Sequence, residues 1–237
     1  MKKNKLLVGL LTCLVATCSF ANAGVQLDRS RVLIDNGSKS VAYAVTNHYE
    51  SPVVASAVIT NFDGTPSNAF AVSPSLYQIK ANSTSQGQIV QLEQLPQDRE
   101  SVFWLNVKTV IGQATGNQAA GNQDEKIIDN VNTGNFGISL AQRIKVFYRP
   151  KDLNENCATA VSKLSWKKSK EGIVVSNPSK VSVSVVKINS KAKEFNISDT
   201  LMPLSEKTLN VKIDKVDNIT FTYVDEYGNF IEAPLKF

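Results

Sequence analysis

Short segments typical of β-strands, bounded by turn residues, recur along the whole chain and leave it few choices of fold. Among them are residues 41–46, 53–60, 87–92 and 102–107, all rich in β-branched or aromatic side chains. Turn dipeptides such as Asn36-Gly37 and Asp63-Gly64 lie between such segments, and they adopt positive φ angles at little cost. No stretch shows a helical period. The pattern predicts an all-β protein built as a sandwich.

The strand-like segments fall into two series. Residues 102–107 (VFWLNV) are apolar on both faces, which predicts a central strand in the first core. Pro150 and a polar stretch then interrupt the pattern. The second series has alternating apolar positions at Val181, Val183 and Val185, at Leu209, Val211 and Ile213, and at Ile219, Phe221 and Tyr223. We therefore expect two domains, at residues 24–150 and 151–237.

The first 23 residues have the form of a secretory signal peptide. Three lysines precede an apolar run at residues 6–15, and residues 21–23 (ANA) supply small side chains for cleavage. A lipoprotein signal ending at Cys18 is the alternative, but Thr17 before the cysteine fits it poorly. We expect residues 1–23 to be removed and the mature protein to be soluble, since no later stretch approaches the ~20 apolar residues of a membrane-spanning helix.

Composition excludes several function classes. Loss of the three signal lysines lowers the formal net charge from +5 to +2, so the basic pI does not indicate nucleic-acid binding. Cys157 is then the only cysteine, which excludes an internal disulfide. His48 is the only histidine, and the chain has no nucleophile motif, Cys/His cluster or acidic calcium loop. We expect no enzymatic activity, no metal and no cofactor.

Residues 136–140 (FGISL) alternate large apolar with small side chains and follow a long Gly-, Asn- and Gln-rich segment at residues 112–134. One interpretation is an ordinary half-buried strand. The other is an edge strand that offers its apolar row to another protein, whose backbone then pairs with it. Because an exposed apolar edge promotes aggregation, a protein that keeps one needs a use for it.

Three cations lie at strand positions where apolar residues are expected. By parity, Arg29 and Arg31 share a face with Val25 and Leu27, so a charge interrupts an apolar row unless a bulge intervenes. Lys145 lies inside an apolar segment as well. These side chains either extend their charged ends into water or converge in a cleft, where a pair of cations would bind a carboxylate.

Three segments, in this order, resemble the signature of PapD-like pilus chaperones: residues 27–31 (LDRSR), 95–106 (LPQDRESVFWLN) and 144–150 (IKVFYRP). The resemblance covers the mature chain and reaches the second domain through residues 223–228 (YVDEYG). It implies two immunoglobulin-like β-sandwich domains set in an L. It also implies a periplasmic chaperone that binds, folds and caps pilus subunits by donor-strand complementation and delivers them to the outer-membrane usher. Neither nucleic acid nor membrane insertion is expected, and a dimer that caps the exposed edge is one option for the free protein.

The resemblance assigns roles to two groups of residues that meet the subunit. Arg31 and Lys145 correspond to the cleft pair that anchors the C-terminal carboxylate of the subunit. Phe136, Ile138 and Leu140 correspond to the donor-strand residues that fill the groove left where the subunit lacks its last strand.

A third group corresponds to an ion-pair network between the domains. Its members are Glu100, Arg149 and Glu226, with Glu226 at a position where the family usually carries Asp. The long segment 112–134 resembles the long-loop branch of the family, whose members typically add a cysteine pair that this chain lacks. Apolar residues within it, at positions 127, 128 and 131, either extend the donor strand or tether the loop.

An exported β-sandwich pilus subunit or adhesin is the alternative function. Such a subunit would carry its alternating donor segment at the mature N-terminus and would usually have one domain. Here the alternating segment precedes Pro150, and two cores follow one another. The order of segments therefore favours the chaperone.

Overall fold

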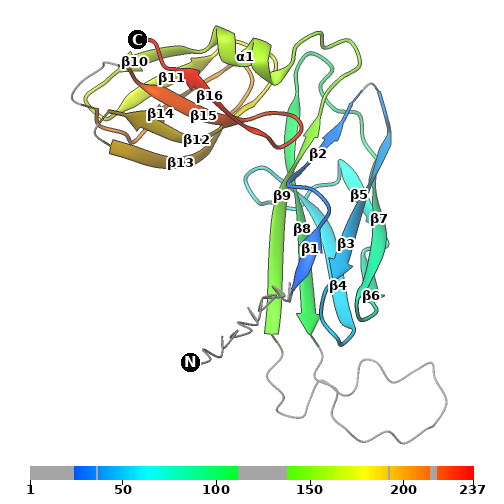
Figure 1. Ribbon diagram of the computed structural model, residues 1–237. Coiled ribbons are helices and arrows are strands. Elements are labelled where there is room, and N and C mark those ends of the chain that lie inside the picture. Colours follow the sequence, from blue (N-terminus) through cyan, green and yellow to red (C-terminus); the bar gives the residue numbers. More distant parts are fainter. Residues whose placement is uncertain (1–23, 36, 112–137, 192, 214–217) are drawn as a thin grey trace, which may run out of the picture.

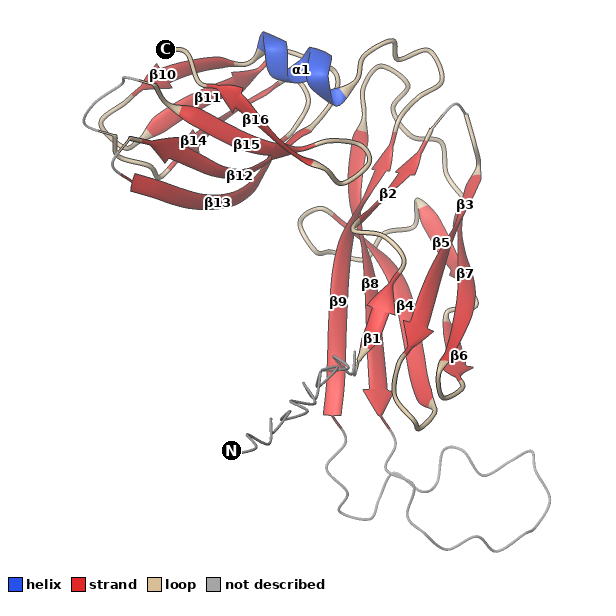
Figure 2. Ribbon diagram, in the orientation of Figure 1, coloured by secondary structure: helices blue, strands red, loops and turns tan. Residues whose placement is uncertain are grey.

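The computed structural model describes residues 24–35, 37–111, 138–191, 193–213 and 218–237. Over these residues the chain forms sixteen strands and one short helix, so the predicted all-β class is confirmed. Two β-sandwiches meet at an angle and give the molecule an L shape (Figure 1). Figure 2 shows the helix at the outer side of the corner between them. In the described ranges, no helix is long and apolar enough to cross a membrane.

The first sandwich packs a five-stranded sheet, in the order β2-β9-β8-β4-β6, against a four-stranded sheet, in the order β1-β3-β7-β5. Its strands are β1 (Val25–Leu27), β2 (Arg31–Ile34), β3 (Ser40–Asn47), β4 (Val53–Asn61), β5 (Phe70–Ser73), β6 (Leu76–Ile79), β7 (Ser83–Gln91), β8 (Ser101–Ile111) and β9 (Ile138–Tyr148). Strand β8 lies between β9 and β4, which confirms the central strand predicted at residues 102–107.

The chain changes sheets between β1 and β2, and this change removes the expected conflict between charge and apolar row. Strand β1 pairs antiparallel with β3, whereas β2 pairs parallel with β9 in the other sheet. The connecting residues 28–30 belong to neither strand, so Arg29 is exposed and forms an ion pair with Asp28. No bulge is needed, because only Arg31 lies within a strand.

The second sandwich packs sheet β13-β12-β15-β16 against sheet β10-β11-β14. Its elements are α1 (Cys157–Lys163), β10 (Ser165–Lys168), β11 (Ile173–Asn177), β12 (Val183–Ser190), β13 (Lys193–Leu201), β14 (Ser205–Leu209), β15 (Thr220–Val224) and β16 (Phe230–Pro234). The strand expected to continue through Val211 and Ile213 ends at Leu209. The Val211 N–H donates to the Leu209 carbonyl, and this tight turn takes the backbone away from the ladder with β11.

Residues 157–163 form a short helix, α1, although the sequence shows no helical period there. The Asn156 side chain accepts a hydrogen bond from the Thr159 N–H, which caps the first turn of α1. A helix of seven residues makes about two turns, too few for an apolar period to show in the sequence. Its buried residues, Cys157 and Ala160, pack into the second core.

Candidate functional site

Strand β9 is paired along one side and only partly along the other. It pairs with β8 over its whole length, but with β2 only from Lys145 to Tyr148. Among the residues that the structure describes, no strand covers the second side of residues 138–144. Strand β9 therefore has an open edge over its first seven residues, directly before the point where β2 begins.

Side chains on the inner face of β9 become more exposed toward the start of the strand. Val146 is fully buried, Ile144 packs against the core, and Leu140 on the same face is 37% exposed. Of the residues predicted for the donor strand, only Leu140 can be placed with its side chain. Ile138 opens β9, but its side chain lies outside the described part of the chain, as does Phe136. The row that the sequence predicted thus continues at Leu140 as an exposed apolar side chain at an unpaired edge.

Arg31 and Lys145 lie side by side at the end of this edge. They are Cα partners in the first step of the parallel β2–β9 ladder. Both side chains reach the second sandwich: Lys145 Nζ donates to Ser184 Oγ at 3.0 Å, and Arg31 Nη1 donates to the Val224 carbonyl at 3.0 Å. The structure therefore brings the two predicted cations together in the corner between the sandwiches.

Acidic side chains lie near both cations without forming an ion pair: Asp225, Glu226 and Glu100 act on Arg31, and Asp199 acts on Lys145. No ion pair to Arg31 or Lys145 forms within the described ranges, and Arg31 Nε is buried without a hydrogen-bond partner. Burial, followed by the neighbouring Arg31 charge, lowers the pKa of Lys145 to about 8. The Arg31 guanidinium also lies 5.4 Å from the centre of the Phe147 ring. This arrangement suits a carboxylate, which would form the direct ion pair that both cations lack within the described ranges.

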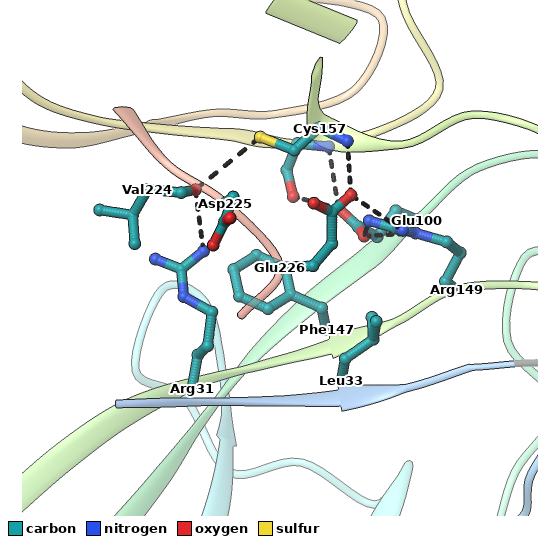
Figure 3. A pocket seen from close by; sticks show the side chains of 10 residues that line it. Arg31, Leu33, Glu100, Phe147, Arg149, Cys157, Val224, Asp225 and Glu226 are labelled. Carbon is teal, nitrogen blue, oxygen red and sulfur yellow. Dashed lines mark hydrogen bonds and ion pairs between the residues drawn. The ribbon is translucent and has the colours of Figure 1, made fainter. Parts of the chain in front are cut away.

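The predicted ion-pair network also comes together, just past the end of β9: Figure 3 shows Glu100, Arg149 and Glu226 side by side. Arg149 Nε and Nη2 lie 3.2 and 2.9 Å from Glu100 Oε1, and Nη1 lies 3.1 Å from Glu226 Oε1. The other Glu100 oxygen accepts hydrogen bonds from the backbone N–H and hydroxyl of Ser182. Burial raises the pKa of the Glu100 carboxyl, while the Arg149 charge and the Ser182 hydrogen bonds oppose that rise.

Glu226 joins this network to the helix. Its Oε1 also accepts the Cys157 N–H at 2.5 Å, so one carboxylate binds both the first sandwich and the start of α1. The Cys157 thiol is buried and donates to the Val224 carbonyl, the same oxygen that Arg31 binds. Burial, with the Glu226 and Glu100 charges, raises the pKa of this thiol to about 12. Cys157 is therefore a neutral packing residue of the interface.

Several contact residues were not predicted. The Ser182 hydroxyl donates a hydrogen bond to Glu100. The Ser184 hydroxyl accepts one from Lys145, and the Val224 carbonyl accepts one from Arg31. The alternation of serine and valine at residues 181–185 places the serines on the face opposite Val181 and Val183. That was the only available signal, because the sequence does not show which part of the other domain covers this face.

Among the described residues, no group of three His, Cys, Asp or Glu side chains could hold a metal ion. The site offers cations, hydroxyls and an unpaired backbone edge. Such groups bind a chain terminus and a β-strand.

Comparison with known proteins is consistent with this geometry. Residues 24–154 match the family model of the pili and flagellar-assembly chaperone PapD N-terminal domain, and residues 159–234 match that of the pili assembly chaperone PapD C-terminal domain. The chain is 30% identical over 227 residues to the chaperone protein FimC of Escherichia coli K12, covering 94% of this chain and 88% of that protein. It is 28% identical over 225 residues to the chaperone protein FimB/FhaD of Bordetella pertussis, covering 88% and 86%.

Solved structures show the same fold. A chain in the complex of the Salmonella enterica SafA pilin with the SafB chaperone superposes with a TM-score of 0.75 at 21% identity, covering 90% of this chain and 95% of that one. The periplasmic chaperone SfaE superposes with a TM-score of 0.70 at 24% identity, covering 90% and 100%. Together the two family models cover nearly all of residues 24–237, and the FimC match covers 94% of the chain, so the chain belongs to the PapD family of pilus-assembly chaperones.

Proposed function

We propose that the protein is a periplasmic chaperone that captures pilus subunits by donor-strand complementation and delivers them to an outer-membrane usher. The observation that carries this proposal is the open edge of β9, which ends at two cations that form no ion pair within the described ranges. The family membership supports a role in folding fimbrial subunits, and it does not favour the alternative of a pilus subunit or adhesin.

In the proposed complex, the captured strand lies in line with β2 at the open edge of β9. Strand β2 runs parallel to β9 and begins at Arg31. A strand that fills the open edge in line with β2 would also run parallel to β9, and it would end where Arg31 and Lys145 lie. Its terminal carboxylate would then meet both cations. Charge would fix the register of the added strand, and the backbone of residues 138–144 would supply the hydrogen bonds.

Apolar burial would supply most of the remaining free energy. Leu140 is exposed at the open edge, and in the proposed complex it enters the groove of the subunit together with Phe136 and Ile138. Each 100 Å² of apolar surface removed from water there stabilises the complex by about 2.5 kcal/mol. Within the described ranges this edge is unpaired, and the proposed complex would cover it.

The proposal includes export and processing. Residues 1–23 act as a signal peptide and are removed, which leaves the domains at residues 24–150 and 151–237. The printed titles of the relatives support the proposed partner: SafB is a chaperone in complex with the SafA pilin. The fold of the two sandwiches resembles that of the periplasmic chaperone SfaE.

The test is co-expression with a pilus subunit encoded beside this gene, followed by co-purification from the periplasm. We expect Arg31→Ala and Lys145→Ala each to weaken capture by about tenfold or more, since each removes a charge-assisted contact to the carboxylate. Lys108→Ala is the matched control, because Lys108 is an exposed cation on the same sheet, one strand away from the open edge. Circular dichroism and thermal unfolding show whether each free variant folds. Control-like capture by both folded variants would reject the anchor.

A further inference from the structure

Arg143 is a third cation on the face of β9 that carries Lys145, and it is held in place by an aromatic stack. The Trp104 ring lies over Phe62, with centroids 5.5 Å apart and planes inclined by 10°. Trp104 Nε1 donates to the Phe62 carbonyl at 3.0 Å, which fixes the indole. The Arg143 guanidinium carbon lies 4.1 Å from the Trp104 ring centre, and Lys145 Nζ lies 5.8 Å from it. One ring therefore positions two cations.

The guanidinium N–H groups of Arg143 are available to bind a ligand. Arg143 is exposed, and no acidic side chain of the described ranges bonds to it. Asp199, the acid that acts on the neighbouring Lys145, is itself paired with Lys207 at 2.7 Å. The stack with Trp104 offsets part of the repulsion from Lys145, and it leaves the edge of the guanidinium open to a ligand.

Arg143 also lies where the open edge would receive a strand. It precedes Lys145 by two residues on the same face, within the part of β9 that β2 does not cover. A captured strand in line with β2 would end beside Arg31 and Lys145. One of its last outward-facing side chains would then neighbour Arg143, at the cross-strand distance of about 5 Å between Cβ atoms.

We propose that Arg143, positioned by Trp104, forms a subsite that selects an acidic side chain next to the C-terminus of the captured strand. This inference rests on the proposed function and deepens it. The cation pair Arg31 and Lys145 would recognise the terminal carboxylate of the strand, which any subunit offers. Arg143 would recognise which side chain precedes the end, and so distinguish one subunit from another.

The experiment uses the purified mature chaperone and synthetic twelve-residue peptides with alternating valine and threonine and a free terminal carboxylate. Glutamate replaces each of the last four residues in turn, and glutamine peptides serve as neutral partners. Fluorescence anisotropy measures each affinity. We expect glutamate to be preferred over glutamine by about fivefold at alternate positions only, the size of a good exposed ion pair. Arg143→Gln should abolish the preference, Arg143→Lys should keep part of it, and Lys108→Gln should leave it unchanged.

Amidated peptides separate this inference from the proposed function. If amidation weakens binding but glutamate and glutamine bind equally at every position, the subsite is refuted and the anchor stands. A glutamate preference that survives Arg143→Gln also refutes the subsite. If amidation has no effect on any peptide, the proposed anchor falls, and the subsite falls with it. A preference that is independent of salt would likewise contradict an ionic contact.

Discussion

Two clusters of charge are centred on Lys145 of β9 and on Arg149, the residue that follows β9, and they differ in how completely their charges are paired. Around Arg149 the charges are matched: the guanidinium binds Glu100 and Glu226, and the side chains of Arg149 and Glu100 are 9% and 1% exposed. Around Lys145 they are not. Lys145 donates to a hydroxyl, Arg31 donates to a carbonyl, and Arg31 Nε is left buried without a partner.

This difference distinguishes a cluster that links the two sandwiches from one that, in the proposed function, binds a carboxylate. The matched cluster joins β8 and β9 to the β15–β16 turn, to Ser182 and to the start of α1, so it fixes the two sandwiches against each other. The unmatched cluster carries a cost in the free protein, because two cations are partly desolvated side by side. A bound carboxylate would relieve that cost, so part of the binding free energy is already built into the fold.

The largest effect is expected from breaking the matched cluster. Glu100→Gln removes the negative charge that faces Arg149, so the buried guanidinium loses its principal partner. It also places an amide NH₂ opposite the N–H donors of Arg149 or the donors of Ser182. We expect the free energy of unfolding to fall by about 3 kcal/mol or more. Urea denaturation followed by tryptophan fluorescence measures it.

Glu194→Gln provides the matched control for that experiment. It makes the same chemical change in the exposed pair Lys187–Glu194, and we expect a loss of less than about 1 kcal/mol. Equal losses in the two variants would mean that the interdomain network contributes no more than a surface ion pair.

The sequence predicts which residues belong to each cluster better than it predicts whether their charges are paired. The segments at residues 95–106 and 144–150 led to Glu100, Lys145 and Arg149 through resemblance, and the central position of β8 followed from its two apolar faces. These features are local, because side-chain parity and turn residues act over a few positions.

What the sequence does not predict depends on contacts between distant segments. Arg149 and Lys145 look alike in the sequence, as basic side chains in or beside a strand. Their difference arises because Glu226 of the β15–β16 turn reaches Arg149, whereas Lys145 meets Ser184. The two-turn helix α1 was not predicted for a local reason: it is too short to show an apolar period, and its first turn is stabilised by the Asn156 cap.

A second prediction tests whether the unmatched cluster is ready for an anion. In the free protein the pKa of Lys145 is lowered to about 8, with Arg31 pushing it down and Asp199 acting in the opposite direction. A bound carboxylate would raise it, so binding takes up a proton at pH values between the two pKa values. We expect affinity for a peptide with a free terminal carboxylate to be constant below about pH 8. Above that pH it should weaken, by up to about tenfold per unit.

Lys145→Arg should remove this pH dependence, because a guanidinium stays protonated over the whole range. Titrating both proteins from pH 6 to pH 10 by fluorescence anisotropy gives the comparison. The same slope in the variant would assign the effect to another group, and a flat profile in the original protein would mean that Lys145 does not bind the carboxylate.

The smallest expected effect is a gain in the free energy of unfolding, opposite in sign to the loss expected for Glu100→Gln. Lys145→Gln removes a desolvated charge beside Arg31 and keeps a donor for Ser184, so we expect the free protein to gain about 1 kcal/mol at pH 7. The pKa of Lys145 is lower in the folded than in the unfolded state. The gain should therefore be full below about pH 8, decline above that pH as the folded lysine loses its proton, and vanish once the unfolded lysine is neutral as well. Urea denaturation at pH 7 and pH 10 measures both values, with exposed Lys108→Gln as the control. A loss of stability at pH 7 would show that Lys145 is matched within the free protein after all, and the contrast between the two clusters would disappear.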